Sequence, residues 1–270
     1  MNICFIGGGN MATALIGGLL KRGYSPAQLR VVEVNAENCR RLHNDFGVIA
    51  DADLAGAVAN NEVIVLAVKP QQLRELSSQL APFLQGQLII SIAAGIRAAD
   101  ISRWLNSQNL VRAMPNTPAL IQCGVAGLYA LSEVKPEQRR QAQDILQAVG
   151  SVVWVTEEEK LDAVTAISGS GPAYVFYFIE AMQQAARELG LNGDDAKRLV
   201  VDTFLGAAKL ADASTDEVSV LRARVTSKNG TTERALLSME ADEVKQHIVA
   251  AVHAAAMRSK EMGDELGRAN

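Results

Sequence analysis

Cysteine and histidine are scarce in this sequence, and their scarcity excludes several kinds of chemistry. An odd, sparse set of cysteines argues against a disulfide framework, and no CxxC or metal-ligand spacing is present among Cys4, Cys39 and Cys123. No HExxH or Ser-His-Asp pattern includes any of the three histidines, His43, His247 and His253. We therefore expect no bound metal and no nucleophilic triad, and the cysteine pattern suits a reducing, cytoplasmic location.

Basic residues are not in excess either. Lysine and arginine total 26 against 30 for aspartate and glutamate, which gives a formal net charge of −4. A protein that binds nucleic acid or an anionic membrane surface needs a basic face. The uncharged stretch 113–132 is long enough to span a bilayer, but Pro115, Asn116 and Pro118 interrupt it. We expect a small-molecule partner, with no nucleic acid and no membrane.

The chain does contain enough apolar material for a core and a clear alternation of strand and helix patterns. It has 270 residues, of which 49% are hydrophobic. In the first half, short β-rich runs alternate with helical patterns, which indicates parallel strand pairing. The expected strands are 2–7, 29–34, 62–68, 87–93, 109–114, 125–131 and 151–156, and the expected helices are 10–22, 37–46, 71–84, 98–107 and 136–149. The pattern predicts an α/β fold, a Rossmann-type doubly wound parallel sheet of about eight strands.

After Thr156 the β-rich runs give way to long alanine-, leucine- and glutamate-rich stretches at helical spacing. We therefore predict a dinucleotide-binding domain at 1–156 and an all-helical domain at 157–270. One helix is expected from Pro172 to Gly190, with Ser168 or Ser170 as its N-cap and Gly190 at its end. Its first half is apolar on several faces, so we expect it to pack against another subunit.

The first strand ends in a glycine-rich turn that fits the pattern G-x-G-x-x-A. Gly7 permits a tight turn, Gly9 lets the backbone approach a pyrophosphate, and Ala12 keeps the next helix close to the sheet. That helix offers free N–H groups and the positive end of its dipole to phosphates. Its place between a strand and a helix favours dinucleotide binding, and the expected cofactor-binding residues here are Ile6, Gly7, Gly8, Gly9, Asn10 and Met11.

The end of the second strand leaves the choice of cofactor open. Glu33 can accept hydrogen bonds from a ribose 2′-hydroxyl, which favours NAD, or it can be a solvated strand residue. Asn35, with Arg40 or Arg41 nearby, can hold a 2′-phosphate, which favours NADP. We take NADP as the preferred cofactor with NAD as the alternative, and Asn35 as a residue that binds it.

Two further loops follow predicted strands, at the positions where ligands bind in open α/β sheets. Small residues at 93–95 let a nicotinamide ribose approach, and Lys69 is expected to lie along the cofactor. Structural alternatives exist, because Pro70 suits a first helical turn and Gly95 a tight turn. The cofactor-binding residues expected from these loops are Ala67, Val68, Lys69, Pro70, Ala93, Ala94 and Gly95.

Near the other end of the chain, Thr231 and Thr232 follow a Lys-Asn-Gly turn and open a helical pattern. Polar turn residues before an apolar periodic run are typical of a helix N-terminus, so a structural cap alone would account for them.

Together these motifs resemble one family. Over essentially the whole chain, their order and content are similar to those of pyrroline-5-carboxylate reductases, at residues 7–11, 67–70, 91–95, 112–118, 168–174 and 230–232. The resemblance implies NAD(P)H-dependent reduction of the cyclic imine 1-pyrroline-5-carboxylate to L-proline, the last step of proline synthesis. It also implies a helical C-terminal domain that interleaves with its twin into an obligate dimer, often assembled into a decamer.

The substrate loop of this family usually reads Ser-Pro-Gly-Gly-Thr-Thr. Carried over by position, the N–H groups of Gly230 and Thr231 bind the substrate carboxylate, and the hydroxyl of Thr232, the catalytic residue, reaches the ring nitrogen. This chain departs from the family because Lys228 and Asn229 replace Pro-Gly. Asparagine tolerates left-handed backbone angles, but lysine lacks the fixed φ of proline.

Two other functions stay open at this point. A β-hydroxyacid dehydrogenase joins similar domains but needs an acid-base group such as lysine on a helix of the second one, and Lys197 and Lys209 stand outside any motif. The other is a regulatory protein that binds the dinucleotide without turnover. Glu158 is a further acidic candidate near the substrate.

Overall fold

The computed structural model describes residues 1–268, and contacts between residues divide the chain into two units. The first unit comprises residues 1–170 together with the chain from 254 onward, and the second comprises residues 171–253. None of the helices within the described residues is long and apolar enough to cross a membrane.

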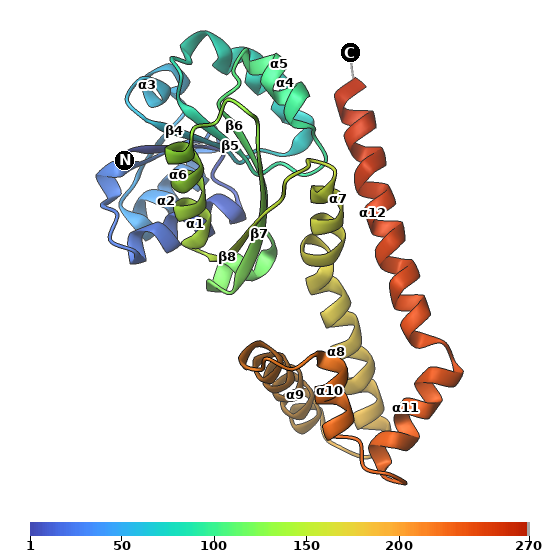
Figure 1. The fold of residues 1–270 in the computed structure, drawn as a ribbon. Coiled ribbons are helices and arrows are strands. Elements are labelled where there is room, and N and C mark those ends of the chain that lie inside the picture. The colour runs from blue at the N-terminus through green and yellow to red at the C-terminus, as the bar shows by residue number, and fades with distance from the viewer. Residues whose placement is uncertain (269–270) are drawn as a thin grey trace. The chain divides into compact units, whose positions relative to one another are not determined.

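An eight-stranded sheet forms the centre of the first unit (Figure 1). Its strands are β1 (Ile3–Ile6), β2 (Leu29–Val32), β3 (Ile49–Asp51), β4 (Val63–Leu66), β5 (Leu88–Ser91), β6 (Leu110–Met114), β7 (Gly124–Ala130) and β8 (Gly150–Trp154). The spatial order is β3-β2-β1-β4-β5-β6-β7-β8, so the chain reverses its direction of winding between β1 and β4. The predicted doubly wound α/β fold is confirmed, and ligands in such sheets bind at this switch point.

One pair of strands departs from the parallel pattern. β6 and β7 are antiparallel, with Arg112 opposite Tyr129. Their connection contains only the 3₁₀ turn η3 (Thr117–Ile121), and a parallel partner would require a crossover of a dozen or more residues. β3 was not among the expected strands, because it is three residues long and its Ile49 is exposed, so no apolar run marks it.

Helices cover both faces of the sheet and enclose two apolar cores. α1 (Asn10–Lys21), α2 (Ala36–Phe46) and α6 (Pro136–Gln147) pack on one face, around Phe5 and Leu15. α3 (Leu54–Ala59), α4 (Pro70–Leu80) and α5 (Ala98–Leu105) pack on the other, around Ile6 and Leu66. Alternate residues of each strand point to opposite faces, which is why Phe5 and Ile6 lie in different cores.

The helix that leaves the first unit begins earlier than expected. α7 (Lys160–Val164) continues through a π-helical segment (Thr165–Gly169) into α8 (Gly171–Glu188). The prediction that Ser168 or Ser170 caps a new helix was wrong, because Ser170 has helical backbone angles and the Ser168 hydroxyl donates to the Val164 carbonyl. The predicted end is confirmed, since Gly190 has φ +93° and the Leu191 N–H closes the helix on the Ala186 carbonyl.

The second unit is entirely helical. It contains α8, α9 (Gly193–Ala213), α10 (Val218–Arg224), α11 (Thr231–Ala241) and the first part of α12 (Val244–Arg268). Among its hydrophobic residues, all of them described, only Ala196 and Val200 are buried. Neither α8 nor α11 buries a single residue. This unit therefore has almost no core of its own.

Candidate functional site

A cavity of about 500 Å³ opens at the carboxyl ends of β1, β2 and β4 in the first unit. Four segments line it, namely residues 6–9, residues 32–34, residues 67–69 and one face of α4 (Gln72, Glu75, Leu76 and Gln79). The position is the one at which open α/β sheets bind ligands. Of the residues predicted from sequence, the structure thus brings together Ile6, Gly7, Gly8, Gly9, Ala67, Val68 and Lys69.

The glycine-rich turn leaves space where a phosphate would need it. Gly7 has φ +102°, and a side chain there would stand 2.7 Å from the Ala67 carbonyl oxygen. Gly9 is the N-cap of α1, no side chain caps this helix, and apart from neighbouring backbone no atom lies within 4 Å of the point where a Cβ of Gly9 would stand. The first turn of α1 therefore has uncapped N–H groups beside open space, which fits the pyrophosphate of a dinucleotide.

Glu33 follows β2 and lines the same cavity beside the glycine-rich turn. Its carboxylate accepts hydrogen bonds from the Gly8 N–H at 3.1 Å, the Asn35 N–H at 2.9 Å and the Asn38 amide nitrogen at 2.8 Å. Burial alone would raise the pKa of Glu33, but the hydrogen bonds from Asn35, Asn38 and Gly8 outweigh burial and hold that pKa below its usual value. The carboxylate is ionised at neutral pH.

The remaining predicted cofactor residues lie outside the cavity lining. Asn10 and Met11 are the first residues of α1, and Pro70 is the first residue of α4. Asn35 is exposed, and its side chain caps α2 by accepting from the Asn38 N–H at 2.9 Å. Residues 93–95 follow β5, and Gly95 lies against α12, where a Cβ would stand 3.1 Å from the Met262 Cβ.

Sequence reasoning did not single out the polar face of α4. Gln72, Glu75 and Gln79 are spaced three and four residues apart, so they lie on one side of the helix that Pro70 begins. That spacing, directly after a loop already assigned to the cofactor, was the available signal.

In the second unit, the predicted substrate residues lie at the first turn of α11. Gly230 is its N-cap, no side chain caps this helix, and Thr231 and Thr232 are exposed. As the first residues of a helix, they have N–H groups without a helical acceptor. A side chain at Gly230 would meet the Ser227 hydroxyl, which would have to turn aside, and would stand 3.0 Å from the Ser227 carbonyl oxygen.

The turn before α11 contains Lys228 and Asn229 and is closed by hydrogen bonds. Asn229 has φ +59°, in the left-handed region that asparagine tolerates. Its N–H donates to the Glu233 carboxylate at 2.6 Å, and the Gly230 N–H donates to the Ser227 carbonyl at 3.0 Å. Two hydrogen bonds therefore fix the turn that proline would otherwise stiffen.

Glu158 takes part in a largely buried ion pair of the first unit. Its carboxylate binds the Arg112 guanidinium and accepts from the Ala98 N–H, at the start of α5, at 2.6 Å. Burial lowers the pKa of Arg112, while the charge of Glu158 opposes that effect. Nearby, Asp162 pairs with Arg97 at 3.0 Å and accepts from the Ser259 hydroxyl at 2.7 Å. These contacts join β6, α5, α7 and the last part of α12.

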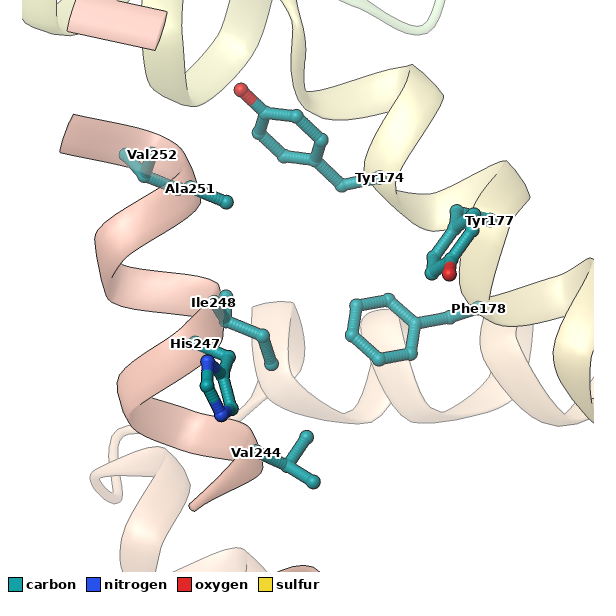
Figure 2. Close-up of a pocket in the computed structure, with 8 residues that line it drawn as sticks. All are labelled: Tyr174, Tyr177, Phe178, Val244, His247, Ile248, Ala251 and Val252. Carbon is teal, nitrogen blue, oxygen red and sulfur yellow. The ribbon is translucent and has the colours of Figure 1, made fainter. Parts of the chain in front are cut away.

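A separate groove of about 300 Å³ lies within the second unit, between α8 and α12. Figure 2 shows the rings of Tyr174 and Phe178 extending from α8 toward α12, which presents Ile248 and Val244 in return. His247 is the basic side chain at its edge. The groove is mostly apolar, so it suits hydrophobic contact. Within the described residues, no cluster of three or more histidine, cysteine or acidic side chains is arranged to hold a metal.

Comparison with known families matches both parts of the chain. A family described as "Pyrroline-5-carboxylate reductase dimerisation" matches residues 158–262. A second, described as "NADP oxidoreductase coenzyme F420-dependent", matches residues 2–95. The second match contains the glycine-rich turn, Glu33 and the loop after β4.

Individual relatives match over nearly their full lengths. The chain is 46% identical to a pyrroline-5-carboxylate reductase of Pseudomonas aeruginosa, with 98% of each chain covered. Its structure is similar to that of a pyrroline-5-carboxylate reductase from Coxiella burnetii, with a TM-score of 0.92 and 39% identity over 97% of this chain and 98% of the other. It also resembles the Plasmodium falciparum pyrroline carboxylate reductase with NADP bound, with a TM-score of 0.87 and 29% identity over the same shares of the two chains.

Proposed function

The chain belongs to the pyrroline-5-carboxylate reductase family, and we propose how its residues divide the work of that reaction. The enzyme reduces 1-pyrroline-5-carboxylate to L-proline with NAD(P)H, the final step of proline biosynthesis. The observation that carries this conclusion is 46% identity to a reductase over 98% of both chains. Two structural features support the proposal further. The glycine-rich turn has open space for the cofactor, and α11 has an uncapped N-terminus for the substrate.

For the cofactor, the open first turn of α1 supports pyrophosphate binding at residues 7–9, with Ile6, Asn10 and Met11 beside it. Ala67, Val68 and Lys69 line the same cavity, Pro70 follows them at the start of α4, and Ala93, Ala94 and Gly95 form the loop assigned to the nicotinamide ribose. The bound nicotinamide supplies the hydride. NADPH is the proposed preferred form, with Asn35 as a residue that binds it, and NADH is the alternative. A relative of known structure that holds NADP supports this choice.

For the substrate, the N–H groups of Gly230 and Thr231 are proposed to bind the carboxylate, because they stand at the positive end of the α11 dipole. The Gly230 N–H must first give up its hydrogen bond to the Ser227 carbonyl. The hydroxyl of Thr232 binds the ring nitrogen. A protonated pyrroline already bears the proton that the amine product needs, so a hydrogen-bonding threonine can replace a general acid such as histidine or lysine. The chain's role is to hold the imine carbon about 3–3.5 Å from the hydride donor.

For assembly, the helical domain, taken as residues 157–270, is proposed to form a homodimer, with a decamer as the larger form. The near absence of a core in the second unit supports this, because its exposed apolar side chains need a cover. The match to a dimerisation family supports it as well. We propose a cytoplasmic enzyme, in keeping with three cysteines that form no disulfide.

One assay separates this function from the alternatives. Purified protein is given NADPH with pyrroline-5-carboxylate, and separately with β-keto acids, while absorbance at the nicotinamide band is followed. Reduction of the imine alone supports the proposal. Consumption of only the keto acid would indicate a β-hydroxyacid dehydrogenase, and cofactor binding without turnover of either would indicate a regulatory protein.

A further inference from the structure

The polar side chains behind the cavity edge form one hydrogen-bonded chain from an acid to a base. Glu33 accepts from the amide nitrogen of Asn38 at 2.8 Å. The amide oxygen of Asn38 in turn accepts from Arg41, with Nε at 3.0 Å and Nη2 at 2.6 Å. Asn38 therefore binds a carboxylate with one end of its amide and a guanidinium with the other.

The acid end of this chain faces the cavity. Glu33 lines it, directly after β2, and the N–H groups of Gly8 and Asn35 fix the two carboxylate oxygens in place. In dinucleotide-binding sheets, an acid at the end of the second strand reads the ribose 2′ position. A fixed negative charge there accepts hydrogen bonds from a 2′-hydroxyl and repels a 2′-phosphate.

The base end is bonded to the protein and does not line the cavity. Besides its two bonds to Asn38, the Arg41 guanidinium donates to the Gly8 carbonyl at 3.4 Å and the Thr13 hydroxyl at 3.2 Å, and it lies 3.8 Å from the Asp45 carboxylate. Arg41 is not among the residues that line the cavity. A guanidinium is the group best suited to bind a 2′-phosphate, but here its donors are directed to the protein.

We propose that Asn38 is a positioning residue for cofactor choice, which keeps Glu33 turned toward the ribose 2′ position and Arg41 turned away from it. The proposal rests on the assignment of this cavity to the dinucleotide. Its consequence is that the network limits the preference for NADPH and keeps NADH usable. Breaking the hydrogen bond from Asn38 to Glu33, or the bonds from Arg41 to Asn38, should raise the affinity for a cofactor that carries a 2′-phosphate.

The test compares the affinities of the full-length protein for adenosine 2′,5′-bisphosphate and for AMP, which differ only in the 2′-phosphate. Both affinities are measured by calorimetric titration. For Glu33→Gln, the affinity for the bisphosphate relative to AMP is expected to rise about tenfold or more, because the repelling charge is gone. Asn38→Ala is expected to shift the ratio in the same direction, because it removes the two shortest hydrogen bonds that hold Arg41 on the protein. Glu37→Gln is the matched control, since Glu37 is an exposed acid in the first turn of the same helix.

A double variant tests the positioning role itself. Arg41→Gln alone should change the ratio little, because Arg41 is held on the protein. In the Asn38→Ala background the same change should remove the gain. The proposal is overturned if neither Glu33→Gln nor Asn38→Ala shifts the ratio beyond about twofold, if Glu37→Gln shifts it equally, or if Arg41→Gln acts alike in both backgrounds. Should Glu33→Gln fail to fold, the Asn38 and Arg41 variants decide.

These titrations need no imine substrate, so their result is independent of turnover. Failure of imine reduction with a normal shift in the ratio would overturn the proposed function and leave the inference standing. Normal imine reduction without any shift in the binding ratio would overturn the inference and leave the proposed function standing. The NADPH-to-NADH ratio of kcat/KM provides a second readout and should move in the same direction as the binding ratio.

Discussion

Thr232 is the single side chain whose removal tests the proposed chemistry most directly. Thr232→Ala should lower kcat/KM for the imine by about 1–3 kcal/mol of transition-state stabilisation, the range for a lost hydrogen-bonding partner, and should leave the affinity for NADPH unchanged. Steady-state kinetics and a cofactor titration measure both quantities. Thr232→Ser keeps the hydroxyl and should retain most of the activity, whereas wild-type kinetics in Thr232→Ala would remove this residue from the mechanism.

Two glycines of the first turn should respond differently to alanine. Gly9 has φ −69° and open space around its missing side chain, so Gly9→Ala should leave the thermal midpoint unchanged and weaken cofactor binding. Gly7 has φ +102° and stands against the Ala67 carbonyl, so Gly7→Ala should cost about 1–3 kcal/mol of stability. Calorimetric unfolding and NADPH titration of both variants give the comparison. A stable Gly7→Ala protein would contradict it.

At this scale the sequence identified individual residues better than their partners. The glycine-rich turn and the left-handed Asn229 could be predicted, because each follows from local backbone requirements. The hydrogen bond from Gly8 to Glu33 joins residues 25 positions apart. The sequence left open whether the Glu33 side chain was solvated, and this bond is what places the carboxylate at the cavity. No local pattern contains such a contact.

Among the elements, the π-helical segment is stabilised by a side chain from another part of the chain. Pro172 has no N–H to offer the helix, and the Ser168 carbonyl accepts instead from the Asn116 side chain at 3.1 Å. The other end of that amide accepts from the Val125 N–H at 2.9 Å, and Asn116 is 9% exposed. One asparagine therefore links the β6–β7 connection to the π-helical segment.

This link predicts coupling between two positions that are far apart in sequence. Asn116→Ala should lower the free energy of unfolding by about 1–3 kcal/mol, because it leaves the partly buried Ser168 carbonyl without a donor and the Val125 N–H without an acceptor. Pro172→Ala restores an N–H nearby, so the same Asn116→Ala change should cost less in that background. Urea unfolding of the four proteins gives the coupling energy. Equal costs in both backgrounds would show that the proline and the asparagine act independently.

The ion pair between Arg112 and Glu158 should carry much of the stability at the start of α5. Their side chains are 8% and 16% exposed, so Glu158→Ala leaves an uncompensated charge and removes the acceptor for the Ala98 N–H. We expect a loss of about 3–5 kcal/mol in chemical denaturation. Glu157→Ala is the control, because Glu157 is 64% exposed and should fall within about 0.5 kcal/mol of the unaltered protein.

Strands and helices with a strong apolar period could be predicted from sequence, because burial on a fixed face leaves that period behind. The strand at residues 49–51 and the helix at 54–59 could not, because they are short and partly exposed. The continuation of α7 into α8 also escaped prediction, since Ser168, Ser170 and Pro172 together have the local signature of a helix start. Here the long-range bond from Asn116 overrides the local signal.

For the whole molecule, the change in residue pattern after Thr156 predicted an α/β part and a helical part, but it did not predict how contacts group the helices into units. The last part of α12 belongs with the first unit, where Gly95 meets Met262 and a side chain at Gly263 would meet Arg97. Helical periodicity identifies a buried face without identifying what buries it. The same limit applies to the exposed apolar side chains of the helical unit.

Those exposed side chains carry the prediction about assembly. Phe176 and Tyr177 on α8 are 65% and 72% exposed, on a helix that buries no residue within its own unit. Large apolar side chains left exposed together on one helix indicate an interaction site. Phe176→Asp should therefore convert the proposed dimer to a monomer, as measured by light scattering after size exclusion. Ile121→Asp is the matched control, because Ile121 is 73% exposed but lies in the first unit. A Phe176→Asp protein that keeps the mass of the unaltered assembly would place the subunit interface elsewhere.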